Sequence, residues 1–186
     1  MCEVEPARSR EAFLLVGGRG RRLGAQPKGL IEHQGEPIIC AVARAVAPLS
    51  ARLTLLSASE EELTRDNRGD ERERYLNALH PLEREGLISQ PVRWCLEPSQ
   101  QLRGGALRAL CAALALSERP WVWALACDLP LLSERALRPL AELTAAQEQT
   151  LIASLYEHEG HLQPLCGLWS RRALPLIQAM LSEGRP

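Results

Sequence analysis

Short apolar runs alternate with amphipathic segments along this chain, and that alternation limits the folds open to it more than any other feature. Each run has the length of a buried strand, and the first ends at Gly17 and Gly18, as is typical of a strand that enters a loop. The predicted strands lie over residues 12–16, 52–56, 121–126, 151–156 and 165–169.

Helical spacing fills the intervals between these runs. Leu107, Leu110 and Leu114 recur at the spacing of one helix face, and residues 38–46 can form a helix that stops before Pro48. Two further helices are predicted, one from an N-cap at Ser133 to about residue 146 and one over residues 171–181. The pattern predicts an α/β fold of three layers, a mostly parallel Rossmann-like sheet with helices on both faces, whose ligands bind at the carboxyl ends of the strands.

Composition excludes several classes of protein. A length of 186 residues with 46% apolar residues suits a single domain over residues 1–186, and a net charge of −1 gives no field to attract nucleic acid. No apolar run approaches the length of about 18 residues that spans a bilayer, and residues 1–10 lack the apolar core of a secretory signal. The six cysteines include no CxxC pair and are expected as reduced core thiols, so we expect a cytoplasmic protein.

Residues 60–74 depart from the alternation, because charges of both signs dominate them and Gly69 lies among them. Such a composition is typical of a solvated helix or a mobile loop. We interpret the segment as an exposed, charged insertion without chemistry of its own.

A glycine- and arginine-rich loop over residues 17–28 follows the first predicted strand. Its glycines let the backbone approach a ligand closely, and inward N–H groups would form a concavity for anions. Its arginines and Lys28 add positive charge that suits a triphosphate. A Walker A loop is excluded because Pro27 precedes Lys28, and the dinucleotide pattern is excluded because Leu23 stands where glycine is required. The alternative is a basic, flexible surface hairpin.

Asp128 follows the strand predicted over residues 121–126. A carboxylate just past a strand end is well placed to hold a hard cation that bridges phosphates. The alternative is an aspartate that only shapes the turn before Pro130. His158 and His161 flank a glycine and are expected to be exposed to solvent rather than to bind a metal.

The run from Leu15 to Gly24, followed by Lys28, resembles the signature loop of nucleotidyltransferases built on an N-terminal Rossmann-like domain. Within that group it is similar to the molybdenum cofactor guanylyltransferases, because the paired Gly17-Gly18 is more like those enzymes, whereas relatives with Ala-Ala-Gly at this point often use other nucleotides. The segment Cys127-Asp128-Leu129-Pro130 is similar to the Cys-Asp-x-Pro of the same family, whose aspartate binds Mg²⁺. The resemblance implies the three-layer nucleotidyltransferase fold.

The resemblance also implies a set of site residues. Lys28 and Arg22 would neutralise phosphates, and Asp128 would complete the catalytic set as the Mg²⁺ ligand. Ser57 stands where the family tends to place asparagine, and Glu97 represents the acidic residue expected further along. The implied nucleotide-binding residues are Leu15, Val16, Gly17, Gly18, Lys28, Ser57, Glu97 and Asp128.

Two segments differ from the family pattern. Residues 105–109 replace its Gly-Pro-Leu-x-Gly and lack both the proline and the second glycine. The chain ends at Pro186, before the Asn-x-Asn segment that commonly supplies a second metal contact, so we expect either that the sequence stops short of this segment or that the protein has lost part of the metal site.

The activity implied by the resemblance is transfer of GMP from GTP to molybdopterin or the molybdenum cofactor, with release of pyrophosphate. A molybdoenzyme or another protein of cofactor biosynthesis is a candidate partner. Two alternatives stay open: cytidylyl or sugar-phosphate nucleotidyl transfer, and a nucleotide-binding accessory protein without catalysis.

Overall fold

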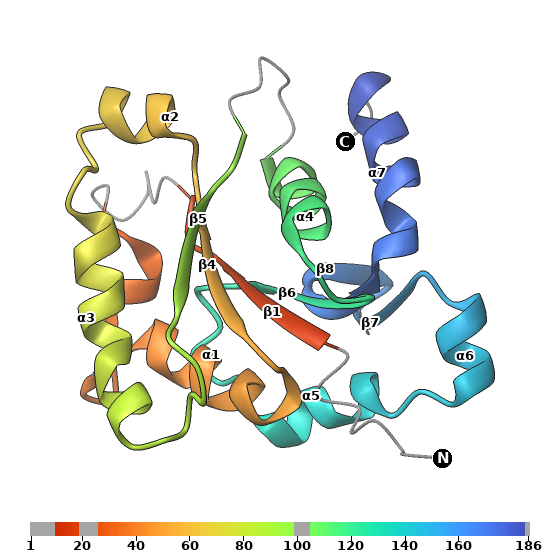
Figure 1. Cartoon of the computed structure of the whole chain (residues 1–186), viewed down its shortest axis with the longest axis horizontal. Coiled ribbons are helices and arrows are strands. Elements are labelled where there is room, and N and C mark those ends of the chain that lie inside the picture. The colour runs from red at the N-terminus through yellow and green to blue at the C-terminus, as the bar shows by residue number, and fades with distance from the viewer. Residues whose placement is uncertain (1–9, 19–25, 99–104, 185–186) are drawn as a thin grey trace.

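A six-stranded sheet lies at the centre of the computed structural model, which describes residues 10–18, 26–98 and 105–184 (Figure 1). The strand order is β5-β4-β1-β6-β8-β7; the first four strands are parallel, β8 runs antiparallel to β6, and β7 runs antiparallel to β8. Its strands are β1 (Arg10–Leu15), β4 (Leu53–Ser57), β5 (Arg93–Leu96), β6 (Trp121–Ala126), β7 (Ala153–His158) and β8 (His161–Ser170). The predicted mostly parallel sheet is confirmed.

Helices cover both faces of the sheet, as predicted, and Figure 1 shows α3 and α4 on opposite sides of β4 and β5. On one face lie α1 (Ile38–Val46), α3 (Glu71–Arg84) and α5 (Glu134–Ala141), and on the other lie α4 (Gly105–Leu116) and α7 (Leu174–Ser182). The smaller elements are α2 (Glu60–Arg65), α6 (Ala145–Thr150), the 3-10 turns η3 (Lys28–Leu30), η4 (Ala47–Leu49) and η5 (Arg171–Ala173), and a hairpin of β2 (Glu32–His33) and β3 (Glu36–Pro37).

Strand β1 explains why the apolar runs are continuous rather than alternating. Ala12 and Leu14 pack in the core beneath α1, while Phe13 and Leu15 pack in the core beneath α4 and α7. A strand that is covered on both faces carries apolar side chains at successive positions and not only at alternate ones. The same holds for β6, where Trp123 is fully buried and donates its indole N–H to the carbonyl oxygen of Leu49 at 3.1 Å.

The prediction that a helix extends from Ser133 to about residue 146 is wrong in its length. Ser133 caps α5 as expected, accepting a hydrogen bond from the backbone N–H of Ala136, but the helix ends at Ala141. A second helix, α6, begins after Thr144, whose side chain and that of Gln147 cap each other's backbone N–H groups. A strong capping box therefore starts a new helix where one long helix was expected.

The thiols of the described cysteines are all free, as expected, and Cys40 and Cys127 are buried. Burial raises the pKa of each of these two thiols to about 11, so both stay protonated at neutral pH. Across the ranges that the structure describes, no helix is both long and apolar enough to cross a membrane.

Candidate active site

The carboxyl ends of the four parallel strands meet at one edge of the sheet, which we call the carboxyl edge. Val16 and Gly17 follow β1, Ser57 ends β4, Glu97 follows β5, and Asp128 lies two residues beyond β6. The chain leaves β1 toward β4 but leaves β5 for β6, on the other side of β1, so the connections diverge between β1 and β6. Ligands of open α/β sheets bind at such a point.

Lys28 and Asp128 meet at this point although 100 residues separate them in the chain. The Nζ atom of Lys28 donates to Oδ2 of Asp128 at 2.7 Å, and each side chain is 38% exposed. The β1–α1 connection brings in Lys28 at the start of η3, while Asp128 extends from the end of β6. The structure thus brings together two of the three residues predicted to be catalytic. The third, Arg22, lies outside the described residues.

Gly17 sits where the end of β1 touches the segment after β4. A Cβ atom at this position would lie 2.7 Å from the backbone nitrogen of Ala58, which is too close for any side chain. The backbone N–H of Val16 donates to the carbonyl oxygen of Leu56 at 2.9 Å and holds the two strands together there. Gly18 is exposed and has open space around it. One glycine therefore fits a close backbone approach, and the other leaves the entrance of the loop open.

Ser57 ends β4 and is fully buried. In the described part of the chain its Oγ atom has no hydrogen-bond partner. A buried hydroxyl without a partner costs free energy, and such groups in native proteins usually call for an explanation. The Ser57 hydroxyl is therefore a candidate for a ligand contact at the carboxyl edge.

Glu97 lies at the same edge, but its carboxylate is already held by Arg108 on α4. The Arg108 guanidinium donates from Nε to Glu97 at 2.6 Å and from NH2 to Glu62 of α2 at 2.6 Å. Burial raises the pKa of Glu97, and the neighbouring Arg108 partly offsets that rise. Nothing local in the sequence marked Arg108 or Glu62 as part of this group, because their pairing depends on three separate elements.

The segment over residues 60–74 was expected to be solvated throughout, and this is wrong for Arg68 and Glu71. Arg68 is 9% exposed and Glu71 is 2% exposed. The two form a bidentate ion pair of 2.6 and 2.8 Å, and Arg68 also donates to the carbonyl oxygens of Gly17 and Val16 at 3.2 and 3.4 Å. No residue of α2 itself, which ends at Arg65, is buried, in agreement with the prediction.

Asp128 is suited to a divalent cation only if other ligands come from elsewhere. Among the residues placed by the structure, no three His, Cys, Asp or Glu side chains gather where they could hold a metal ion. Mg²⁺ commonly needs only one or two protein carboxylates, since substrate phosphates and water complete its shell. The donor set at Asp128 therefore fits a cation that arrives with a nucleotide. His158 and His161 are exposed, as expected.

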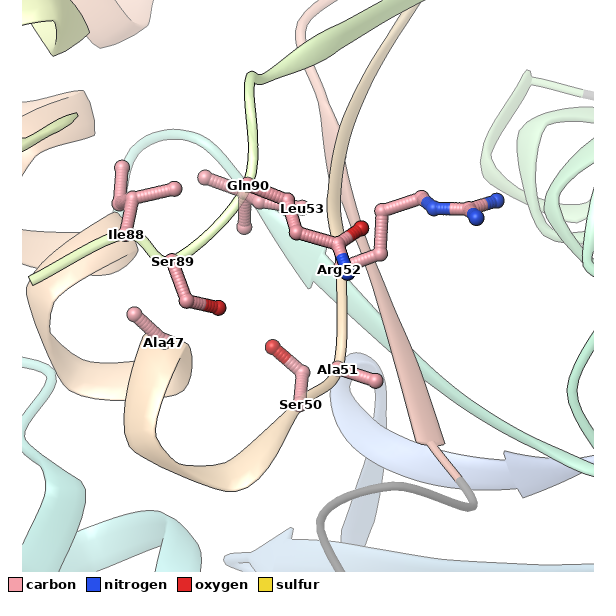
Figure 2. Close-up of a pocket in the computed structure, with 8 residues that line it drawn as sticks. All are labelled: Ala47, Ser50, Ala51, Arg52, Leu53, Ile88, Ser89 and Gln90. Carbon is pink, nitrogen blue, oxygen red and sulfur yellow. The ribbon is translucent and has the colours of Figure 1, made fainter.

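Two hollows lie at opposite ends of the strands, one on the side of the carboxyl edge and one on the side where the parallel strands begin. One, of about 240 Å³, is lined by residues of the β2–β3 hairpin and by Pro130, which stands two positions after Asp128. The other, shown in Figure 2, lies where η4 leads into β4, with Ser50, Arg52 and Ile88 in its wall. Its volume is about 10 Å³, enough for about one water molecule. Of the two hollows, only the first is large enough to take part of a substrate, and Pro130 in its wall stands two positions after Asp128.

The fold and the carboxyl edge define a nucleotidyltransferase of the three-layer α/β type, and comparison with known proteins agrees. Residues 12–186 match the model of the MobA-like NTP transferase domain. A probable molybdenum cofactor guanylyltransferase of Synechococcus elongatus is 30% identical over 174 residues, which cover 94% of this chain and 78% of the relative. The chain belongs to the MobA-like NTP transferase family and is a nucleotidyltransferase.

Solved structures share the fold. The molybdopterin-guanine dinucleotide biosynthesis protein A of Archaeoglobus fulgidus aligns with a TM-score of 0.61 at 17% identity, covering 94% of this chain and 74% of that one. A protein of Mycobacterium tuberculosis determined as a complex with manganese aligns with a TM-score of 0.53 at 12% identity, covering 94% and 77%.

Proposed function

We propose that this protein transfers GMP from GTP to molybdopterin or the molybdenum cofactor and releases pyrophosphate. The observation that supports the proposal is the Lys28–Asp128 ion pair. It brings an ammonium group and a carboxylate suited to binding a metal together between the ends of β1 and β6. The curated relative at 30% identity is named as a probable guanylyltransferase for this cofactor. Its name supports the choice of nucleotide and acceptor.

In the proposed reaction a terminal phosphate oxygen of the acceptor attacks the α-phosphorus of GTP. The bond between the α-phosphorus and the oxygen that bridges to the β-phosphate breaks, and pyrophosphate leaves with the bonding electrons. Such a transfer needs little covalent chemistry from the protein, because positioning and charge neutralisation lower most of the barrier.

Each proposed residue has a place in that scheme. Leu15 ends β1 and Val16 follows it. The backbone N–H groups of the next two residues, Gly17 and Gly18, bind the phosphates. Lys28 neutralises them, and we assign the same task to Arg22. The hydroxyl of Ser57 and the edge near Glu97 lie on the β4 and β5 side, which we assign to the nucleoside.

Asp128 is the proposed ligand of Mg²⁺. The bound cation would neutralise charge that develops on the phosphate oxygens during transfer. In the structure Lys28 neutralises the Asp128 carboxylate. Binding of the nucleotide would replace part of this ion pair with contacts from Lys28 to phosphate.

The alternative function is transfer of another nucleotide, such as CMP, to a related acceptor. The Ser57 side chain is shorter than that of the asparagine that the family tends to carry at this position. Because we assign this side of the site to the nucleoside, base selectivity should be tested directly. An accessory protein that binds nucleotide without transferring it would share the loop but lack turnover.

The test is a titration with the four nucleoside triphosphates in the presence of Mg²⁺, followed by assay of pyrophosphate release with molybdopterin. GTP should bind at least about tenfold more tightly than CTP or ATP, a difference of about 1.4 kcal/mol, and it alone should support release. Equal affinities would move the assignment to the alternative transfer. Tight GTP binding without release would leave the accessory protein.

A further inference from the structure

Arg68 lies outside every motif that identifies the family, yet it is bonded to the start of the nucleotide loop. It is 9% exposed and comes from the turn between α2 and α3, about fifty residues from the loop in sequence. Its NH1 and NH2 atoms donate to the carbonyl oxygens of Gly17 and Val16 at 3.2 and 3.4 Å. We infer that Arg68 is a positioning residue that fixes the direction of the loop's backbone N–H groups for the nucleotide phosphates, an inference that rests on the proposed function.

The geometry of the peptide bond gives the reason. In a trans peptide the C=O and N–H bonds point in opposite directions, and the unit is planar. The carbonyl of Val16 shares its peptide plane with the N–H of Gly17, and the carbonyl of Gly17 shares its plane with the N–H of Gly18. By holding both carbonyl oxygens on its own side, Arg68 turns both N–H groups to the opposite side. Two successive N–H groups with the same orientation form a concavity that binds anions.

The surroundings of Arg68 suit a role in position rather than in direct phosphate contact. Glu71, 2% exposed, accepts from Nε and NH2 of Arg68 at 2.6 and 2.8 Å and neutralises its charge. Burial alone would lower the pKa of Arg68, but the hydrogen bonds and charge of Glu71 raise it, so the guanidinium keeps its proton and all its donors. A rigid planar fork that meets a carboxylate on one side and two carbonyls on the other cannot be replaced by lysine without loss.

The chain offers a matched control at the other end of the same strand. Arg10 begins β1, is 3% exposed, and donates from NH2 to the carbonyl oxygen of Ala141 at 2.5 Å. Arg10→Met and Arg68→Met each remove a buried guanidinium that binds backbone carbonyls. Only Arg68 is bonded to the loop. A loss of nucleotide affinity shared by both variants would therefore come from lost stability, and a loss confined to Arg68→Met would come from the loop.

The experiment measures the dissociation constant of whichever nucleoside triphosphate binds the wild type most tightly, with Mg²⁺, together with thermal unfolding of each variant. Arg68→Met should weaken binding about tenfold, and Arg68→Lys, which can still reach one carbonyl, about threefold. Arg10→Met should melt earlier but bind as the wild type does. In steady-state assays Arg68→Met should raise KM for the nucleotide and leave kcat within about twofold, because the metal carboxylate is untouched.

Unchanged affinity in Arg68→Met, or an equal loss in Arg10→Met, would overturn the inference while leaving the proposed function intact. If Arg68→Met does not fold, Arg68→Lys decides in the same way, since wild-type affinity in that variant would show that the fork is not needed. A wild type that binds none of the four triphosphates would overturn the proposed function itself, and this inference with it.

Discussion

A buried carboxylate at the edge where the parallel strands begin, which we call the amino edge, and a buried hydroxyl at the carboxyl edge differ in their partners. At the amino edge the Glu11 carboxylate is fully buried and accepts from Thr54 Oγ1 at 3.3 Å, from Ser117 Oγ at 3.0 Å and from the backbone N–H of Glu118 at 3.3 Å. At the carboxyl edge the buried Ser57 hydroxyl finds no such partner within the described ranges. The amino edge is thus closed by contacts within the protein.

The two edges also differ in how open they are to solvent. The cavity near the amino edge (Figure 2) has room for only about one water molecule. Lys28 and Asp128 at the carboxyl edge are each 38% exposed. Polar groups at the amino edge therefore stabilise the fold, whereas Lys28, Asp128 and Ser57 at the carboxyl edge are proposed to bind the nucleotide. Substitutions at the first edge should change the free energy of unfolding, and substitutions at the second should change binding or turnover.

The largest effect is expected for Asp128→Asn, which should abolish pyrophosphate release. In the proposed mechanism the carboxylate holds the cation that neutralises charge in the transition state, while Lys28 and the loop backbone would still hold the nucleotide. GTP affinity measured by calorimetry should stay within about tenfold of the wild type. A variant that still turns over at the wild-type rate would show that Asp128 is not the metal ligand.

At the amino edge, Glu11→Ala should lower the free energy of unfolding by roughly 2–4 kcal/mol, because it leaves buried donors without their acceptor. Chemical denaturation measures this loss. The control is Glu118→Ala, which removes an exposed partner of Arg52 and should cost less than about 1 kcal/mol. The folded fraction of Glu11→Ala should bind GTP normally; weakened binding would mean that the two edges are not separate in function.

Lys28→Ala should weaken triphosphate binding roughly tenfold to a hundredfold, the loss of a charge-assisted hydrogen bond of about 1.5–3 kcal/mol. Thermal unfolding without nucleotide should change little, since the pair with Asp128 is partly exposed. Arg44→Ala, which removes a comparably exposed cation paired with Glu36, serves as the control for net charge. Equal GTP affinity in the Lys28 and Arg44 variants would place the triphosphate elsewhere.

Ser57→Ala gives the smallest and most discriminating effect. Without nucleotide the variant should be as stable as the wild type or slightly more so, because it removes a buried hydroxyl that lacks a partner. With nucleotide it should bind about three to ten times more weakly, the net value of one hydrogen bond. A clear loss of stability without nucleotide would mean that Ser57 is satisfied within the fold and belongs with the closed edge.

Much of the fold could be predicted because its strands are buried on both faces. β6 (Trp121–Ala126) has the predicted bounds, since a fully covered strand must be apolar throughout. β5 (Arg93–Leu96) was not predicted, because it is short, begins with a charged residue and lies at the edge of the sheet. The reversed direction of β8, which is antiparallel to both β6 and β7, was not foreseen either, since apolar runs do not encode strand direction.

The candidate site could be predicted only where chemistry is local in the sequence. Lys28 lies within the loop motif and Asp128 directly follows a strand, and the structure places them in contact. Arg68 and Arg108 lie in segments that look solvated or helical, and only the folded chain brings them to Gly17 and Glu97. Buried ion pairs of this kind leave no local pattern, because each partner is set by the packing of distant elements.

If the nucleotide binds at the carboxyl edge, the backbone at the amino edge should be unaffected by it. Hydrogen–deuterium exchange with and without GTP and Mg²⁺ tests it most directly, since exchange reports local opening of backbone amides. The amides of residues 16–18, 57–59 and 127–129 should exchange more slowly with nucleotide, whereas those of residues 49–52 and 117–119 should exchange as before. Protection confined to the second set, or none at the first, would contradict the assignment.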